Sequence, residues 1–227
     1  MSQKIVIMGD AHGEWAALEK LIEKENPDLL ISVGDLGYWP KRGPGIVRAG
    51  SVESFFRDNK TKILFCPGNH ENWDAIDERK SDEILPNVFY MPRGSTYTLD
   101  DGRKILFFGG SDSIDKAWRR EGVSWFRQEL PSKRHIDRLD PNDKFDIVVS
   151  HTCPDELVGN MLKAVGSTWE AGDPTTKYLS YILNTYKPPL WYFGHWHIGK
   201  TGFFEITKTK WTALPMSCGN SSWWEVV

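Results

Sequence analysis

The sequence predicts an α/β protein with a mixed sheet, or two packed sheets, flanked by helices. Three observations support this fold class. Short, strongly apolar runs recur along the chain, stretches with helical periodicity separate several of them, and the last part of the chain has the pattern of strands joined by a short turn. Apolar runs of this length fit strands buried on both faces, and strand–helix alternation favours parallel pairing with right-handed crossovers.

Two stretches have the spacing of amphipathic helices. Residues 14–25 carry Leu18 and Ile22 at helical spacing, so that one face is apolar. Residues 178–186 repeat this spacing, and the preceding Pro174 suits the first turn of a helix because its missing N–H has no partner there anyway. Both stretches lie between apolar runs, as the crossover helices of an α/β fold do.

The strands are predicted from the apolar runs, and the final third of the chain differs from the rest. Residues 203–207 and 210–214 have the pattern of a strand pair, and residues 223–227 that of a last strand, so the sheets are expected to be mixed. The buried strands are expected at residues 4–8, 29–33, 63–66, 105–108, 147–149 and 190–193.

Length and composition indicate one globular domain over residues 1–227. Hydrophobic residues make up 40% and charged residues 26% of the chain, an ordinary balance for a soluble protein. The net charge of -3 does not favour a dedicated double-stranded nucleic-acid binding surface. Nothing in the sequence indicates an oligomeric state.

The N-terminus and the cysteines predict a cytoplasmic protein. The first apolar run is too short for a signal peptide, and no stretch approaches the length of a membrane span, so no membrane partner is expected. Cys66, Cys153 and Cys218 lie far apart, are odd in number and form no Cys-x-x-Cys pair. We therefore expect reduced thiols rather than disulfides or a thiolate metal site.

Metal-capable side chains follow five of the apolar runs, each directly after a small or turn-forming residue. Ligands of α/β proteins bind outside the carboxyl ends of the strands, so five strands would deliver these side chains to one edge. A glycine before the side chain permits a sharp turn and a close backbone approach. The five residues are Asp10, Asp35, Asn69, His151 and His195.

The histidines are concentrated in the same segments. Five of the six lie there, and only His135 lies elsewhere, in a polar stretch. A lone histidine is more often a structural residue, but five beside two aspartates and an asparagine have the composition of a metal site. The five are His12, His70, His151, His195 and His197.

These segments occur as five ordered blocks: D-x-H from Asp10, G-D ending at Asp35, G-N-H-E around Asn69, then His151, then G-H-x-H from Gly194. In this order they resemble the calcineurin-like metallophosphoesterase superfamily, in particular its small bacterial and phage-type members. The resemblance implies the α/β/β/α sandwich of that superfamily, with two mixed sheets packed together. A single block is a weak signal, but the ordered set of five is specific.

The resemblance further implies a dinuclear metal site that hydrolyses phosphate esters. A water bridging two cations ionises near neutral pH and can attack phosphorus in line while both cations stabilise the phosphate oxygens. Mixed nitrogen and oxygen ligands suit Mn²⁺, with Fe, Zn²⁺ or Ni²⁺ as alternatives. By resemblance the first metal would be held by Asp10, His12, Asp35 and His197, and the second by Asp35, Asn69, His151 and His195, so that Asp35 bridges the two and is catalytic.

His70 is the second catalytic candidate. In the family pattern this histidine is not a ligand but lies near the leaving-group oxygen, where it would act as general acid. The alternative is a structural histidine that holds the loop. Asn69 likewise has an alternative role as an ordinary turn residue after Pro67-Gly68, and Glu71 is expected to support the loop.

The sequence departs from the protein-phosphatase branch of the superfamily in its second and third blocks. Tyr38 stands where that branch has the aspartate that orients the general acid, and Trp39 and Pro67 replace its two phosphate-binding arginines. Arginine forks suit dianionic monoesters, so phosphodiesters are favoured. Trp39, followed by Lys41 and Arg42, would offer an aromatic surface for substrate binding, or would simply pack in the loop core.

A further segment after a predicted strand, residues 108–122, is rich in glycine and charge. It should open onto the same edge of the sheet and carry substrate contacts or orient His70. The alternative is a solvated helix start with local ion pairs. Arg119 is the first candidate for substrate binding, and the others are Asp112, Asp115 and Arg120.

The sequence thus predicts a metal-dependent phosphoesterase with a phosphate-ester substrate, with phosphodiesters of nucleotide or nucleic-acid type favoured. The alternatives are a phosphomonoesterase or Ser/Thr protein phosphatase, and a catalytically inactive metal-binding scaffold of the same fold. A scaffold is expected to lose His70 or a ligand, whereas this chain has competent residues at all of these positions. A single-metal enzyme would leave Asn69 and two histidines unexplained.

Overall fold

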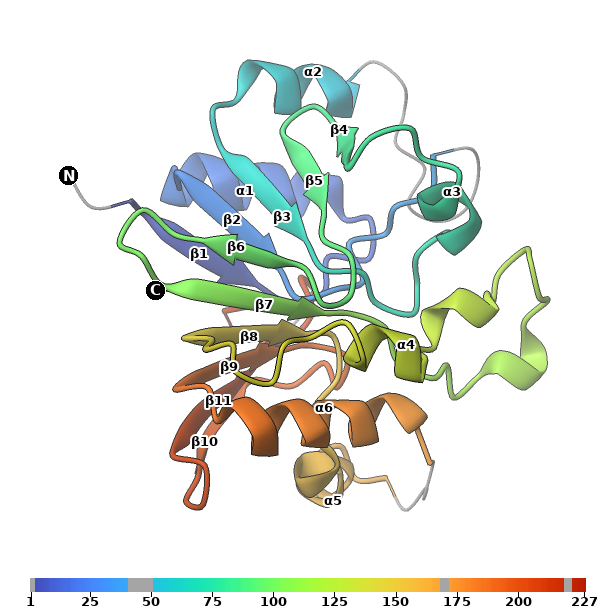
Figure 1. The fold of residues 1–227 in the computed structure, drawn as a ribbon. Helices are drawn as coiled ribbons and strands as arrows, with labels where there is room; N and C mark the ends of the chain where they lie inside the picture. The colour runs from blue at the N-terminus through green and yellow to red at the C-terminus, as the bar shows by residue number, and fades with distance from the viewer. Residues whose placement is uncertain (1–2, 41–50, 168–171, 219–221) are drawn as a thin grey trace.

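Two mixed sheets of six strands lie face to face, with helices on the outer face of each (Figure 1). The computed structural model describes residues 3–40, 51–167, 172–218 and 222–227. The α/β/β/α sandwich predicted from the sequence is confirmed.

The first sheet has the strand order β12-β1-β2-β3-β5-β4. Its four central strands are parallel, and the outer strands β12 and β4 are antiparallel to their neighbours. The polarity of the central strands brings the loops after β1, β2 and β3 to one edge. The strands are β1 (Ile5–Met8), β2 (Leu29–Ser32), β3 (Lys62–Phe65), β4 (Glu83–Leu85), β5 (Val88–Tyr90) and β12 (Trp224–Val226).

The second sheet has the order β10-β11-β9-β8-β7-β6 and again four parallel central strands between two antiparallel outer ones. The loops after β7, β8 and β9 leave it at one edge. The strands are β6 (Thr96–Thr98), β7 (Lys104–Phe108), β8 (Ile147–Ser150), β9 (Leu190–Phe193), β10 (Lys200–Phe204) and β11 (Thr209–Ala213).

The helices form the two outer layers (Figure 1). Two predicted helices are present: α1 covers the first sheet, and α6 covers the second and begins at Pro174 behind an Asp173 cap. The full set is α1 (Trp15–Glu25), α2 (Ser51–Asp58), α3 (Trp73–Asp77), α4 (Lys133–Ile136), α5 (Asp155–Ala164) and α6 (Pro174–Tyr186), with short 3₁₀ turns η1 (Lys116–Trp118) and η2 (Arg127–Glu129) between β7 and β8.

One predicted strand is displaced. Residues 203–207 were expected to be extended, but β10 ends at Phe204 and the four residues 205–208 form the turn that leads into β11. Lys208 takes a positive φ of 59°, which closes the turn. The apolar side chains Phe203 and Ile206 are 49% and 91% exposed. The apolar pattern of this stretch therefore did not correspond to the buried face of a strand.

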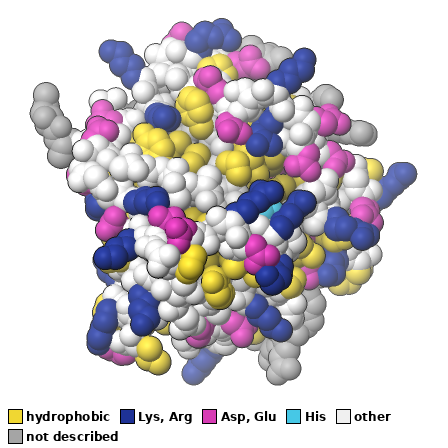
Figure 2. Space-filling model, in the orientation of Figure 1, with side chains coloured by type: hydrophobic (Ala, Val, Ile, Leu, Met, Phe, Trp, Pro, Cys, Tyr) yellow, Lys and Arg dark blue, Asp and Glu magenta, His cyan; other side chains and the backbone are white. Residues whose placement is uncertain are grey.

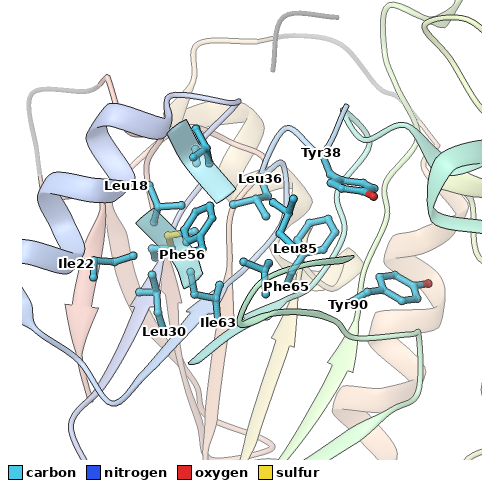
Figure 3. Packing of buried hydrophobic residues seen from close by; sticks show 14 of the residues in the cluster. Leu18, Ile22, Leu30, Leu36, Tyr38, Phe56, Ile63, Phe65, Leu85 and Tyr90 are labelled. Carbon is cyan, nitrogen blue, oxygen red and sulfur yellow. The ribbon is translucent and has the colours of Figure 1, made fainter. Parts of the chain in front are cut away.

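The core has three layers because successive residues of a strand point to opposite faces of the sheet. In β1, Val6 faces α1, whereas Ile5 and Ile7 face the second sheet. Figure 3 shows the outer cluster of the first sheet, in which Leu18 and Ile22 of α1 pack near Leu30 and Ile63. The middle cluster joins the two sheets and thereby fixes the two sets of carboxyl-terminal loops relative to each other.

On the face shown in Figure 2, acidic and basic side chains are interspersed. Within the described ranges, no helix is both long and apolar enough to cross a membrane.

Candidate metal centre

The five strand-end side chains converge where the two sheets meet. Asp10 follows β1, Asp35 follows β2, Asn69 follows β3, His151 follows β8 and His195 follows β9. Four of them are buried: Asp10, Asp35, Asn69 and His151. Asp10 Oδ2 accepts a hydrogen bond from the backbone N–H of His195 at 2.9 Å, which ties the loops of the two sheets together.

Backbone geometry at this junction is strained in the way common at functional sites. A positive φ is unfavourable for residues with a Cβ, yet it is held here at four candidate ligands by the surrounding contacts. These are His12 (48°), Asp35 (45°), His195 (66°) and His197 (53°).

The glycines before the candidate ligands are required because side chains of other candidate ligands approach them closely, as the sequence predicted. A Cβ on Gly34 would lie 2.2 Å from His151 Nδ1, and one on Gly194 would lie 2.0 Å from Asp10 Oδ1. Any larger residue at these positions would displace a candidate ligand of the opposite sheet.

The first cluster consists of Asp10, His12, Asp35 and His197, with one candidate ligand atom of each within 4.8 Å of all the others. The Nε2 atoms of His12 and His197 face each other at 3.0 Å, and His197 Nε2 lies 3.3 Å from Asp10 Oδ2. The buried Oδ1 of Asp10 has no hydrogen-bond partner among the described residues. A cation would take up this orphaned oxygen and the facing ring nitrogens, so the donor set fits a divalent metal.

The second cluster surrounds the side-chain oxygen of Asn69. Asn69 Oδ1 lies 3.0 Å from His151 Nε2 and 3.1 Å from His195 Nδ1. His151 Nε2 is also 3.3 Å from Asp35 Oδ2. These separations are those of neighbouring donors around one small cation, whose bonds to nitrogen and oxygen are about 2.0–2.2 Å long.

Asp35 lies between the two clusters. Its Oδ2 is 3.3 Å from His151 Nε2 on one side and 3.7 Å from His12 Nε2 on the other. Its Oδ1 accepts the backbone N–H of His70 at 2.8 Å. Burial raises the pKa of this carboxyl, but the imidazoles around it, His151 first, outweigh that effect and hold the pKa well below its usual value.

His151 is fully buried and His195 is half-buried, and the two have opposite pKa shifts. Burial lowers the pKa of His151, but the Asp35 carboxylate outweighs it and the pKa rises to about 9. Burial, together with the neighbouring His151, lowers the pKa of His195 to about 3. His195 is therefore neutral and available as a ligand, while His151 would release a proton on metal binding.

His70 lies beside the clusters rather than in them. Its ring is 5.1 Å from that of His12, and its backbone carbonyl accepts a hydrogen bond from Trp39 Nε1 at 2.7 Å. Arg119 Nη2 lies 2.9 Å from His70 Nε2. Burial lowers the pKa of His70, and Arg119 lowers it further, while the Asp35 carboxylate raises it.

Trp39 packs in the loop core, which was the alternative to an aromatic surface for substrate binding. It is buried, packs against Phe126 at a ring-centroid distance of 5.8 Å and holds the His70 backbone. It is not among the residues that line the cavity beside the clusters. Tyr38 is likewise buried in the outer core cluster (Figure 3). Lys41 and Arg42 lie outside the described residues.

A cavity of about 820 Å³ opens beside both clusters and brings Arg119 and Asp112 to the candidate centre. Asp112 is paired with Lys116 at 2.6 Å, and Asp115 with Arg119 at 2.8 Å. Arg120 is exposed and does not line the cavity. The apolar part of the wall is made by Ile114, Ala117, Val158, Leu162, Val165 and Trp196.

Glu71 supports the loops that carry Asp35 and Asn69, as expected. Its buried carboxylate accepts the backbone N–H groups of Gly37 at 3.0 Å and of Gly68. Burial and the nearby Asp35 raise its pKa to about 8.

Sequence reasoning missed four polar residues that contact the second cluster or its partners. The segment after β7 was recognised, but the roles of its serines were not. Half-buried Arg93 fixes this segment by donating to the backbone carbonyls of Gly109 at 2.7 Å and Glu129 at 2.6 Å. The missed residues are Ser111, Ser113, Glu129 and Asp173.

Comparisons with known proteins agree with this architecture. The chain is 14% identical to the protein TT1561 of Thermus thermophilus (TM-score 0.55; 96% of this chain, 91% of that one). It is also 14% identical to a phosphopantetheinyl hydrolase of Mycobacterium tuberculosis (TM-score 0.56; 100% and 96%). At these identities the likeness shows the fold.

One curated relative matches by sequence. It is a CWF19-like protein 1 homolog of Drosophila melanogaster, 24% identical over 115 residues. The match covers 48% of this chain and 21% of the relative, so it spans about a fifth of that protein.

The sequence model described as "Calcineurin-like phosphoesterase" matches residues 3–199, a range that contains all seven candidate ligands and His70. This match extends over most of the chain and both sheets. The chain therefore belongs to the calcineurin-like phosphoesterase family.

Proposed function

We propose that this protein is a phosphoesterase that uses two divalent cations bridged by Asp35. The observation that carries the proposal is the position of Asp35 Oδ2 between His151 Nε2 of one cluster and His12 Nε2 of the other, at 3.3 and 3.7 Å. A buried carboxylate with imidazoles on both sides can bind two cations with its oxygens.

The chain's own side chains would hold the cations. The first would bind Asp10, His12, Asp35 and His197, and the second Asp35, Asn69, His151 and His195. Mixed nitrogen and oxygen donors without thiolate favour Mn²⁺, with Fe, Zn²⁺ or Ni²⁺ as alternatives. When bound, such a pair supplies a water that ionises near neutral pH and neutralises charge on the phosphate oxygens.

His70 would protonate the leaving-group oxygen. Its backbone is fixed at both ends, by the N–H donated to Asp35 Oδ1 and by the carbonyl bonded to Trp39. Its ring lines the cavity beside Asn69 and Arg119. A proton donor held this close to the cluster can act on the departing oxygen without a large movement.

Arg119 would bind the phosphate group or its ester oxygen. It replaces in part the positive charge that Trp39 and Pro67 do not provide, and Asp115 holds it at 2.8 Å. A single guanidinium suits a singly charged phosphodiester better than a dianionic monoester, which would call for more positive charge. The largely apolar cavity wall leaves room for a second ester group. Phosphodiesters of nucleotide or nucleic-acid type are therefore favoured over phosphomonoesters and phosphoproteins.

Asp112 is the weaker candidate for a substrate contact. It lines the cavity, but its carboxylate is bound to Lys116, so it would act by placing the Lys116 ammonium group rather than by meeting phosphate. The inactive-scaffold alternative has no support from the centre, since all seven ligand side chains and His70 are grouped there.

The test is hydrolysis of bis-p-nitrophenyl phosphate and p-nitrophenyl phosphate with added Mn²⁺ by the wild-type chain and by Asp35→Asn and His195→Ala. We expect turnover of the diester by the wild type and its loss in both variants, with circular dichroism showing that they fold. The Thr61→Val variant, which removes a buried hydroxyl bonded to Pro27 far from the centre, is the control. Full activity in Asp35→Asn would disprove the proposal.

A further inference from the structure

The loop after β7 approaches the second cluster with two buried serines. Ser111 and Ser113 are 0% and 1% exposed, and they alternate with Asp112, whose side chain turns to Lys116 instead. We infer that Ser111 and Ser113 are positioning residues for the second metal site, each linking a carboxylate behind it to one ligand. The inference rests on the proposed metal site and adds what orients two of its ligands.

The first link runs from Asp173 through Ser111 to His195. Ser111 Oγ lies 2.8 Å from Asp173 Oδ2 and 3.2 Å from His195 Nε2. An ionised carboxylate only accepts, so the serine O–H donates to Asp173 and its lone pair accepts N–H from His195. This arrangement places the imidazole proton on Nε2 and leaves the lone pair on Nδ1.

That tautomer is the one the second site needs. His195 Nδ1 is the ring nitrogen that faces Asn69 Oδ1, at 3.1 Å. Metal-binding histidines are oriented by the hydrogen bond of their other ring nitrogen, which fixes the tautomer and raises the basicity of the ligating atom. Asp173 is itself fixed, because its Oδ1 accepts the Thr175 N–H at the start of α6.

The second link runs from Glu129 through Ser113 to Asn69. Asn69 Nδ2 donates to Ser113 Oγ at 3.0 Å, and the backbone N–H of Ser113 donates to Glu129 Oε1 at 3.1 Å. The same Glu129 oxygen also accepts the indole N–H of Trp125. With its amide nitrogen engaged in this way, Asn69 turns its oxygen toward His151 and His195, as a metal ligand must.

The first cluster lacks such links within the described part of the chain. In that cluster the ring nitrogens that face each other are the Nε2 atoms of His12 and His197, at 3.0 Å. Their side chains are 21% and 39% exposed, against 0% for His151. The serine links therefore act on one site of the two, and their removal should weaken one binding event selectively.

The experiment is calorimetric titration of Mn²⁺ into the full chain after removal of metal by chelation. The variants are Ser111→Ala and Asp173→Asn, with Thr61→Val as the buried-hydroxyl control. Asn at position 173 can still cap the helix, so we expect Asp173→Asn to fold even if Ser111→Ala folds poorly. His195→Ala identifies the binding event that belongs to the second site, because it deletes the ligand.

We expect Ser111→Ala to weaken the His195-dependent event about 10- to 100-fold, the usual effect of losing such a partner, and to leave the other event within about threefold. Asp173→Asn should weaken the same event by less. In the His195→Ala background, Ser111→Ala should change nothing further, because the two residues act through one contact.

Unchanged affinity in both Ser111→Ala and Asp173→Asn would overturn the inference, and so would equal weakening of both events. If the wild-type chain binds two Mn²⁺ ions and Ser111→Ala binds both with unchanged affinity, the serine links alone are refuted. A wild-type chain that binds no second ion would refute the proposed function as well.

Discussion

Arg119 and His70 are in direct contact: Nη2 of the arginine lies 2.9 Å from Nε2 of the histidine. A guanidinium can only donate, so the imidazole nitrogen accepts. Asp115 holds the other side of the guanidinium, at 2.8 Å from Nε. A fixed positive charge therefore stands beside the candidate proton donor, and it comes from the loop after β7 rather than from the loops that carry Asp35 and Asn69.

Replacing Arg119 should lower activity on phosphodiesters. Charge-assisted hydrogen bonds contribute about 1.5–3 kcal/mol, so Arg119→Met is expected to reduce kcat/KM about 10- to 100-fold. Arg119→Lys should recover only part of this, because an ammonium lacks the planar fork. Steady-state kinetics with bis-p-nitrophenyl phosphate measures the effect. Wild-type kinetics in Arg119→Met would exclude a role in substrate binding.

Replacing His70 should affect poor leaving groups most. A general acid contributes about 10²–10⁴-fold when the departing oxygen needs a proton, and little when the leaving group is a stable anion. We expect His70→Ala to show the larger loss with alkyl esters and a small loss with a dinitrophenyl ester. A series of esters with graded leaving-group pKa values measures this dependence. Equal losses across the series would contradict the general-acid role and leave His70 a structural residue.

Replacing Glu71 should destabilise the fold. Its carboxylate binds two buried backbone N–H groups, of Gly37 and Gly68, and Glu71→Ala would leave both without that partner. A buried unsatisfied group costs about 1–3 kcal/mol, so a loss of about 4 kcal/mol in unfolding free energy is expected. Urea denaturation measures it, with Thr61→Val, which breaks one hydrogen bond, as the smaller comparison. A loss of unfolding free energy in Glu71→Ala smaller than the loss in Thr61→Val would refute the supporting role of Glu71.

His135 should make stability pH-dependent. Burial lowers its pKa from 6.5 to about 4, helped by the positive charge of Arg93. Protonation is thus harder in the folded protein than in the unfolded chain. The stability due to neutral His135 is complete above pH 6.5 and is lost as the pH falls toward 4. Thermal unfolding between pH 4 and 7.5 should show a shallower decline for His135→Gln. Parallel wild-type and variant curves would show that His135 does not contribute.

The convergence of the strand-end side chains could be predicted from sequence because both their chemistry and their position are local properties. Asp10 and His195 each follow an apolar run and a glycine, and the glycines proved necessary for space. The hydrogen-bond partners of these side chains could not be predicted in this way. Ser111 is 84 residues from His195 and 62 from Asp173, and a serine in a glycine-rich loop carries no sign of its contacts.

Trp39 and residues 203–207 show two other limits of sequence reasoning. An aromatic residue next to a ligand can face substrate or the loop core, and only packing against Phe126 decides between them. Residues 203–207 are rich in residues that favour strands, yet the turn lies among them, because the pairing of β10 with β11 sets the register. Tertiary contacts overrode the local pattern in both cases.

The bridging position of Asp35 is the central claim, and metal stoichiometry tests it most directly. The wild-type chain, purified without chelator and saturated with Mn²⁺, should contain two metal ions by elemental analysis after gel filtration. Asp35→Asn, which removes the charge shared by both clusters but keeps the side-chain shape, should lose affinity at both sites. A single tightly bound ion in the wild type, or two ions held equally well by Asp35→Asn, would contradict the account.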